Sequence, residues 1–184
     1  MILPIVAFGN PILRSKCQNI SADYPDLIDL LSNMWETMYQ ANGVGLAAPQ
    51  INKSIRLFLI DTTPFNDDEE ISNDQIVKKV FINPILIEES GEKWSFNEGC
   101  LSIPDIREDV IRNSTITISY FDENFKKHTD VFDGLVARVI QHEYDHINGV
   151  LFVDKISPLR KRMIKGKLKD ITKGNVKVSY KMRF

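Results

Sequence analysis

Hydrophobic residues recur at helical spacing in one stretch near the start of the chain. Between residues 25 and 40 they stand at positions 27, 30, 31, 34 and 38, a spacing that places side chains on one face of a helix. Asp23 is a suitable N-cap, and Asn42-Gly43 is a stop signal. The pattern predicts a helix over 25–40.

Two apolar runs, 55–61 and 80–87, are typical of buried strands. Pro84 removes a backbone donor from the second run, which predicts a sheet edge or a bulge there. The segment between them, 62–79, contains four consecutive acids at 67–70. A solvated surface loop and a functional acidic patch both fit this composition.

The second half of the chain begins with an alternating run at 115–120, and an Asp-Glu-Asn connection at 122–124 leads to a second run at 125–132. These features predict a β-hairpin. A helix is expected to begin after Asp133 and to end at Gly149.

A third helix is predicted from Ser157-Pro158 to Gly174. Its expected inward face consists of Leu159, Met163, Leu168 and Ile171. Alternation at 176–184 predicts a last strand. Long helices mixed with mostly antiparallel strands indicate an α+β fold.

Composition places the chain among globular proteins with one domain, residues 1–184, because 43% of its residues are hydrophobic and 26% are charged. The net charge of -2 hides an asymmetry, since residues 160–184 hold ten basic residues and one acid.

No apolar run is long enough for a membrane helix, and no signal peptide is expected. Two cysteines are too few for a disulfide scaffold, so we expect reduced thiols in the cytoplasm.

The second helix carries His142 and His146 one turn apart on one face, with Glu143 between them. Leu135 and Val139 continue that face, so both imidazoles are expected to point inward. Two converging imidazoles form a metal site, and the adjacent carboxylate can reach a water at the metal. Two core histidines and a surface glutamate are the alternative interpretation.

A catalytic metal site uses a third protein ligand and keeps one position open. No glutamate follows Glu143, and Phe152 stands where a third histidine would extend the motif, so the third ligand must lie upstream. Cys100 is the strongest candidate, because a thiolate is a good ligand for a borderline divalent metal. We expect His128 to be a solvated histidine in a polar hairpin and Cys17 to be a packing residue.

A third segment, 43–50, reads GVGLAAPQ. Its small residues allow another backbone to lie close, and Gln50 offers an amide donor. Taken alone, a turn built from small residues for packing would also explain it.

Together these segments resemble one family, peptide deformylase. Its signature motifs, GxGxAAxQ, EGCxS and QHExDHxxG, match residues 43–50, 98–102 and 141–149 at every defining position. The similarity extends from Pro4 to Pro158, and the segment after Pro158 is not identified by it.

The resemblance implies one divalent metal ion held by Cys100, His142 and His146, with water in the fourth position. The family uses Fe2+, and Ni2+, Co2+ or Zn2+ can take its place in purified protein. The implied reaction is hydrolysis of the formyl group from N-formylmethionine at the start of a nascent peptide, with release of formate.

The resemblance also implies roles for residues around the metal. Glu143 would move the proton of the attacking water to the departing amine, while the Gln50 side chain and the Leu101 N–H would donate to the oxyanion. Gly45 and the nearby backbone would pair with an extended substrate. The slot for the methionine side chain would be lined by Val44, Leu101, the stem of Arg138, and Val139.

Residues behind the ligands are candidates for holding them in place. Glu98 and Asp145 are expected in this role, with Arg112 as their charge partner. For Arg112, an exposed surface charge is an equally good interpretation.

Two other functions are consistent with part of this pattern. A zinc endopeptidase would keep the two histidines and the glutamate, although the missing downstream ligand argues against it. A non-catalytic metal-stabilised module would need a fourth protein ligand, for which Cys17 and His128 are the candidates.

The basic segment 158–184 has two interpretations, a solubilising helix surface or electrostatic docking on ribosomal RNA. We expect a monomer whose partners are formyl-Met nascent peptides, with no membrane and no sequence-specific nucleic acid.

Overall fold

A computed structural model describes residues 1–67 and 76–184, so most of the acidic run at 67–70 lies outside the described residues. The elements are β1 (Ile5–Val6), η1 (Pro11–Arg14), α1 (Leu27–Gln40), β2 (Gly45–Ala47), η2 (Ala48–Ile51), β3 (Leu57–Asp61), α2 (Thr63–Asp67), β4 (Lys78–Cys100), β5 (Ile103–Phe121), β6 (Lys127–Asp133), α3 (Gly134–Ile147), η4 (Phe152–Asp154), α4 (Pro158–Thr172) and β7 (Met182–Arg183). The α+β class is confirmed. The segment predicted as a loop at 62–79 contains the short helix α2, which the sequence analysis missed.

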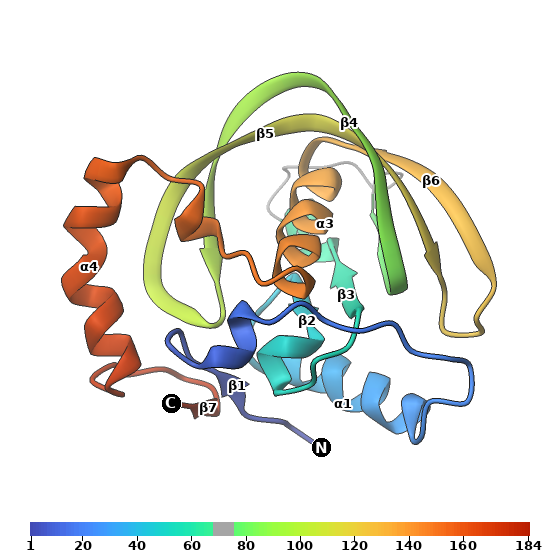
Figure 1. The fold of residues 1–184 in the computed structure, drawn as a ribbon, viewed down its shortest axis with the longest axis horizontal. Helices are drawn as coiled ribbons and strands as arrows, with labels where there is room; N and C mark the ends of the chain where they lie inside the picture. Colours follow the sequence, from blue (N-terminus) through green and yellow to red (C-terminus); the bar gives the residue numbers. More distant parts are fainter. Residues whose placement is uncertain (68–75) are drawn as a thin grey trace.

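Five antiparallel strands form the main sheet in the order β2-β3-β4-β5-β6. Figure 1 shows the long strands β4 and β5 bending around α3. The register between β4 and β5 shifts between Ile82 and Ile85, so Pro84 lies at the predicted irregularity, in an interior strand. The two strands also cover residues 88–100 and 103–114, where the sequence pattern predicted no strand.

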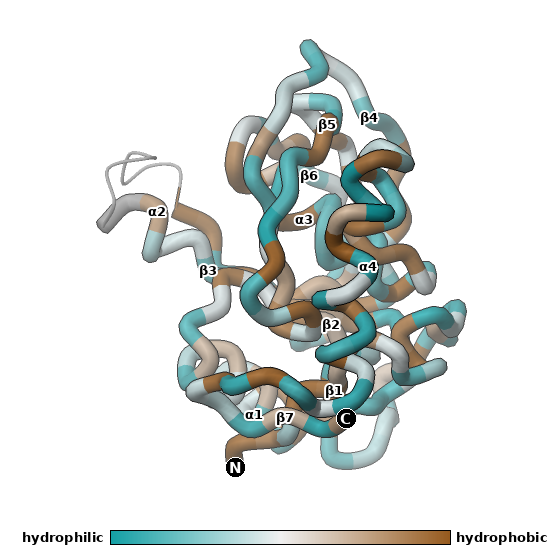
Figure 2. Tube along the Cα trace, turned by 90° about the vertical axis from the view of Figure 1, so that its left-hand side faces the viewer, coloured by the Kyte–Doolittle hydropathy of each residue, from teal (hydrophilic) through white to brown (hydrophobic). Residues whose placement is uncertain are grey.

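Helix α3 is the central element, and it packs against the inner face of this sheet. Its apolar side buries Val136, Ala137, Ile140 and Ile147, which belong to the same core cluster as the stacked rings of Phe58 and Phe81 on β3 and β4. Figure 2 shows hydrophilic residues at the outermost bend of β4, away from this core. The helix is therefore held on its apolar side, and its His142–His146 face is set by that packing.

Helix α1 begins two residues later than predicted, and Asp23 is not its N-cap. Asp26 occupies the cap position with a φ of 55° and makes no capping bond. Asp23 instead accepts a hydrogen bond from the Ser21 hydroxyl, because short polar side chains compete for local turn contacts. The predicted apolar face is confirmed, with Leu27, Leu31, Met34 and Met38 buried.

Helix α4 starts as predicted, with the Ser157 hydroxyl accepting from the backbone N–H of Arg160 at 3.3 Å. Its predicted inward face was wrong in part, since Leu159 and Met163 are 68% and 62% exposed. The stripe that faces the body of the protein runs instead through Arg160, Ile164, Leu168 and Ile171. Arg160 begins this stripe because its guanidinium pairs with Glu108 on β5 at 2.6 Å.

The C-terminal residues alternate between half-buried and exposed positions as predicted, but only β7 is a strand. It pairs with β1 in parallel, Ile5 opposite Met182 and Val6 opposite Arg183. Both termini therefore lie on the same side of the molecule (Figure 1). Within the described residues, no helix has the length and apolar character needed to cross a bilayer.

Candidate metal centre and active site

Three side chains that could hold a metal converge at the end of β4 and on α3. The Cys100 sulfur lies 3.3 Å from Nε2 of His146, and one donor atom each of Cys100, His142 and His146 lies within 4.8 Å of the others. Cys100 closes strand β4, while the two histidines stand one turn apart on α3. The structure thus brings together the three ligands that the sequence analysis proposed.

The chemistry of these donors fits a divalent cation. One thiol and two imidazoles make three protein ligands, the number that leaves a position open for catalysis. Burial lowers the pKa of His146 well below its ordinary value, which favours the neutral ring that a metal can bind. Burial also lowers the pKa of His142, but contacts with Cys100 and Glu98 outweigh it and raise the pKa well above normal. Cys100 and Glu98 therefore favour a positive charge at the His142 ring.

The second nitrogen of His142 is held by a buried carboxylate. Glu98 Oε2 lies 3.0 Å from His142 Nδ1, an arrangement that leaves Nε2 free for a metal. Glu98 also accepts from Arg112 at 2.7 and 3.0 Å and from Arg138 at 2.9 Å. Burial would raise the pKa of Glu98, but the bonds to His142 and Arg112 hold it well below its usual range.

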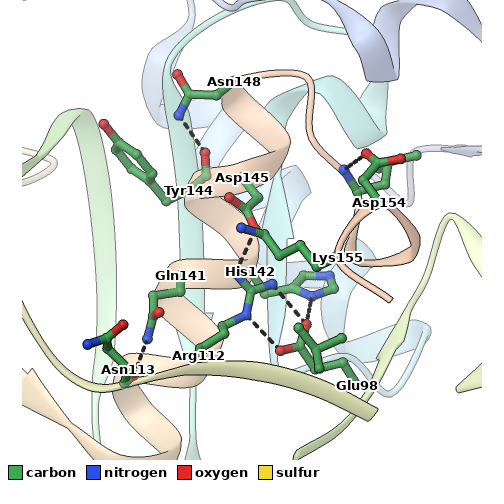
Figure 3. A network of polar contacts seen from close by, with 12 residues as sticks. Glu98, Arg112, Asn113, Gln141, His142, Tyr144, Asp145, Asn148, Asp154 and Lys155 are labelled. Carbon is green, nitrogen blue, oxygen red and sulfur yellow. Dashed lines mark hydrogen bonds and ion pairs between the residues drawn. The ribbon is translucent and has the colours of Figure 1, made fainter. Parts of the chain in front are cut away.

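Arg112 connects this carboxylate to α3. Its guanidinium donates to Asp145 Oδ2 at 2.6 Å, and Lys155 contacts the same oxygen at 3.3 Å (Figure 3). Arg112 is 6% exposed, so it is a buried side chain paired with Glu98 and Asp145 and not an exposed surface charge. Gln141 Nε2 adds a further link from α3 to β5, donating to the Asn113 carbonyl at 3.1 Å (Figure 3).

Glu143 lies in the same buried region without a hydrogen-bond partner for Oε2 among the described residues. Burial raises its pKa to about 7. Strand β2 passes so close that a Cβ added to Gly45 would lie 2.5 Å from Glu143 Oε1. The glycine at position 45 is therefore needed for this approach.

Gln50 and the Cys100–Ile103 turn complete the polar side of the centre. Gln50 Oε1 accepts from the Ala47 N–H at 2.8 Å, which directs Nε2 towards Ser102 Oγ at 3.3 Å and the Cys100 sulfur at 3.6 Å. Leu101 lies in the turn next to Cys100. Both residues are thus adjacent to the candidate ligands, as expected.

A cleft of about 910 Å³ opens from this centre. All five residues proposed for substrate contact line it: Val44, Gly45, Leu101, Arg138 and Val139. The sequence pattern did not indicate that the Arg138 guanidinium is itself buried, bonded to Glu98 and to the carbonyls of Val110 and Trp94. Nor did it indicate that the C-terminal residues 177–180 form another part of the lining.

His128 and Cys17 lie outside the centre. His128 Nε2 is 2.7 Å from Asp122 Oδ2 at the β5–β6 hairpin and is half-buried rather than fully solvated. Cys17 is buried in an apolar cluster. Neither side chain supplies a fourth ligand.

Comparison with known proteins identifies the family. The profile of polypeptide deformylase matches residues 2–162. The chain belongs to the polypeptide deformylase family. A peptide deformylase of Christiangramia forsetii is 59% identical over 189 residues, covering 100% of this chain and 96% of that protein. One from Salinibacter ruber is 41% identical, covering 98% and 93%.

A solved structure shows the same architecture. The peptide deformylase of Legionella pneumophila superposes with a TM-score of 0.82 at 35% identity, covering 95% of this chain and 98% of that one. Polypeptide deformylases are metal-dependent hydrolases that remove the N-formyl group from nascent peptides, and this is the activity of the chain. The resemblance drawn from the three motifs is confirmed.

Proposed function

We propose that Cys100, His142 and His146 hold one divalent metal ion, Fe2+ in the cell, and that Ni2+, Co2+ or Zn2+ can take its place. The observation that carries this assignment is the convergence of the three donor atoms within 4.8 Å, beside the buried carboxylate of Glu143. When bound, the metal would supply Lewis-acid chemistry by lowering the pKa of a water molecule to about 7.

Glu143 is the proposed general base and acid. Its buried carboxylate, with a pKa of about 7, is suited to take a proton from the attacking water at neutral pH. The same group then returns the proton to the nitrogen of the departing methionine. The absence of a competing hydrogen bond at Oε2 among the described residues keeps this oxygen available for the transfer.

The Gln50 amide and the Leu101 N–H are the proposed donors to the oxyanion. Removing a donor of this kind commonly lowers kcat by about 10²–10³. Val44, Leu101, Arg138 and Val139 would enclose the methionine side chain, while Gly45 at the edge strand β2 would pair with the substrate backbone. Glu98, Arg112 and Asp145 are proposed to keep His142 in its orientation.

The assignment is tested by anaerobic purification, metal analysis and formate release from formyl-Met-Ala. Cys100→Ser and His142→Ala should lose most of the metal and the activity. Cys17→Ser is the matched control, since this buried thiol lies outside the centre, and it should retain both. Full activity with stoichiometric metal in either ligand variant would refute the ligand set.

A second variant separates binding from chemistry. Glu143→Gln preserves shape but cannot move the proton, so it should keep the metal and lose about 10²–10⁴ in kcat. A kcat close to that of the unmodified enzyme would show that Glu143 is not the base. The same assay with unformylated peptides discriminates deformylation from endopeptidase activity.

We further propose that residues 1–184 act as a single domain and as a monomer in the cytoplasm, where formylated nascent chains arise. Support for the monomer is that one chain supplies every residue of the proposed site.

We propose electrostatic docking of α4 on ribosomal RNA. Lys165, Lys169 and Lys173 are exposed, whereas Arg160 and Lys161 are engaged with Glu108 and the Asp154 carbonyl. Reversing the three exposed lysines to Glu should weaken co-sedimentation with ribosomes in a salt-dependent manner. Formate release from a short peptide should not change.

Reversal of Lys93, Lys126 and Lys127, which are exposed on the sheet hairpins, is the matched control for total charge. If the variant with reversed charges on α4 binds ribosomes as well as this control variant does, α4 is a solubilising surface.

A further inference from the structure

The C-terminal residues 175–184 lie outside the family match at 2–162, yet four of them, 177–180, form part of the cleft wall. After α4 the chain turns at Gly174, where φ is 73°. Backbone bonds then fix the segment, with the Ile5 N–H donating to Lys181 at 2.9 Å and the Ala7 N–H to Arg183 at 2.7 Å. Tyr180 is thereby held between β1 and the cleft.

The Tyr180 hydroxyl donates a 2.7 Å hydrogen bond to the carbonyl of Leu101. Its ring packs against the core cluster that contains Ile5 and Met38. The bond thus runs from an anchored side chain to the turn that follows Cys100.

This turn is contacted from outside the hairpin. Cys100 pairs with Ile103, so Leu101 and Ser102 form a two-residue connection between β4 and β5. Such connections usually adopt turn types with positive φ, but neither residue has one. Three contacts hold the turn instead: Tyr180 on the Leu101 carbonyl, the Phe8 N–H on the Ser102 carbonyl at 2.8 Å, and Gln50 on the Ser102 hydroxyl at 3.3 Å.

We propose that Tyr180 is a positioning residue for deformylation. The Leu101 carbonyl belongs to the middle peptide of the turn, so fixing it sets ψ of Leu101 and φ of Ser102. These angles determine where the Leu101 N–H lies relative to Ser102, whose hydroxyl holds Gln50. The inference rests on the proposed function, in which the Leu101 N–H and the Gln50 amide stabilise the oxyanion.

Tyr180→Phe in the metal-loaded enzyme tests this role, because the ring and its packing are kept and the hydroxyl alone is lost. We expect kcat for a formyl-Met peptide to fall roughly 3- to 10-fold, the rate equivalent of one hydrogen bond. KM and metal content should not change. Tyr120→Phe is the matched control. The Tyr120 hydroxyl donates a 2.7 Å hydrogen bond to Asp130, and this bond lies away from the cleft, so the variant should retain kcat.

A thioformyl-Met peptide provides a readout that a general loss of rigidity would not move. Sulfur is a weak hydrogen-bond acceptor, so this substrate depends less on the oxyanion donors. The ratio of kcat between the unmodified enzyme and Tyr180→Phe should therefore be smaller for the thioformyl than for the formyl peptide. Equal ratios for the two peptides would overturn the proposal.

Gln50→Ala, measured in parallel, separates the two levels of the argument. If Gln50→Ala loses kcat and Tyr180→Phe does not, the role of Tyr180 is refuted and the oxyanion donors stand. If neither variant loses kcat, both assignments are refuted. Thermal melting of both Tyr→Phe variants identifies any loss caused by unfolding, and a kcat defect of Tyr180→Phe confined to temperatures where it melts would also refute the role.

Discussion

Replacing Glu98 by Gln is the most demanding test of how the protein orients its proposed metal ligands. The carboxylate accepts four hydrogen bonds, two from Arg112 and one each from Arg138 and His142. Gln keeps the shape but presents an NH2 group to one set of donors. The guanidiniums of Arg112 and Arg138, whose side chains are 4% and 2% exposed, would lose the carboxylate that they contact.

The expected loss follows from the burial of these partners. Removing one member of a buried ion pair costs about 3–5 kcal/mol of unfolding free energy. Arg112 keeps its 2.6 Å bond to Asp145, so we expect the lower limit, about 3 kcal/mol. For a chain of this length that corresponds to a fall in Tm of about 6–12 °C. Metal affinity should also fall about 10–100-fold, because His142 loses its fixed partner.

Urea unfolding at pH 7 in the presence of a chelator measures the first effect, and metal titration measures the second. Glu108→Gln is the control, because Glu108 is another buried acid whose partner, Arg160, is 49% exposed. Water can solvate Arg160 after the change, so Glu108→Gln should lower the unfolding free energy by at most about 1 kcal/mol. A loss for Glu98→Gln no larger than that of the control, with unchanged metal affinity, would refute the reasoning.

Three further predictions concern other parts of the molecule. Gly45→Ala should lower kcat for formate release about 100-fold without changing the metal content, because a Cβ at position 45 displaces Glu143. An unaltered kcat would show that the close approach of β2 to Glu143 is not needed. The iron-loaded enzyme should lose activity in air while the nickel form does not, since thiolate and Fe2+ both oxidise; equal lifetimes would contradict this. Burial would raise the pKa of Asp61, but bonds from Thr63 and Tyr39 outweigh it and keep the pKa below 3.8, so Asp61→Asn should destabilise the fold above pH 3.8 and progressively less as the pH falls below it. Urea titrations from pH 6 to about 3 test the last point, and a constant difference would refute it.

The helix with the two histidines could be predicted closely because the residues that define it are near one another in the sequence. The interval between His142 and His146 fixes their common face, and Leu135 and Val139 indicate which way that face is directed. Cys100 could be proposed because a thiolate is a good ligand for a borderline divalent metal, and the chain has only one other cysteine. That it lies 3.3 Å from His146 depends on pairing between β4 and β5, which no local pattern reports.

The long hairpin of β4 and β5 was missed because its inward face is partly charged. Glu108 and Arg112 point inward along β5, while Ile111 on the same strand is 65% exposed. Glu108 pairs with Arg160 on α4, and Arg112 pairs across the hairpin with Glu98 on β4. The apolar alternation that marks a strand is therefore interrupted at the positions that hold the site.

A similar reason explains the error in α4. Leu159 and Met163 fit an amphipathic helix as well as Ile164 and Ile171 do, and hydrophobicity alone does not rank them. In the structure, Ile164 and Ile171 pack into a cluster that contains Leu13, and the ion pair between Arg160 and Glu108 lies on the same side of the helix. Leu13 and Glu108 are far from α4 in the sequence, so no local pattern indicates which apolar residues are buried.

The two carboxylates beside the proposed ligands illustrate how the fold divides orientation from proton transfer. Glu98 and Asp145 pair with Arg112 and Arg138, and Lys155 also contacts Asp145. Glu98 is the member of this network that contacts His142, in line with its proposed role in orienting that ring. Burial would raise the pKa of Glu98, but its bonds to His142 and Arg112 hold the pKa well below its usual range, so it cannot accept a proton at neutral pH. Glu143, one residue from His142, has no cationic partner at its buried Oε2 among the described side chains, and burial raises its pKa to about 7. Neighbouring groups whose pKa values are moved apart in this way are typical of groups with distinct roles, which supports the proposal that Glu143 rather than Glu98 exchanges protons with the substrate.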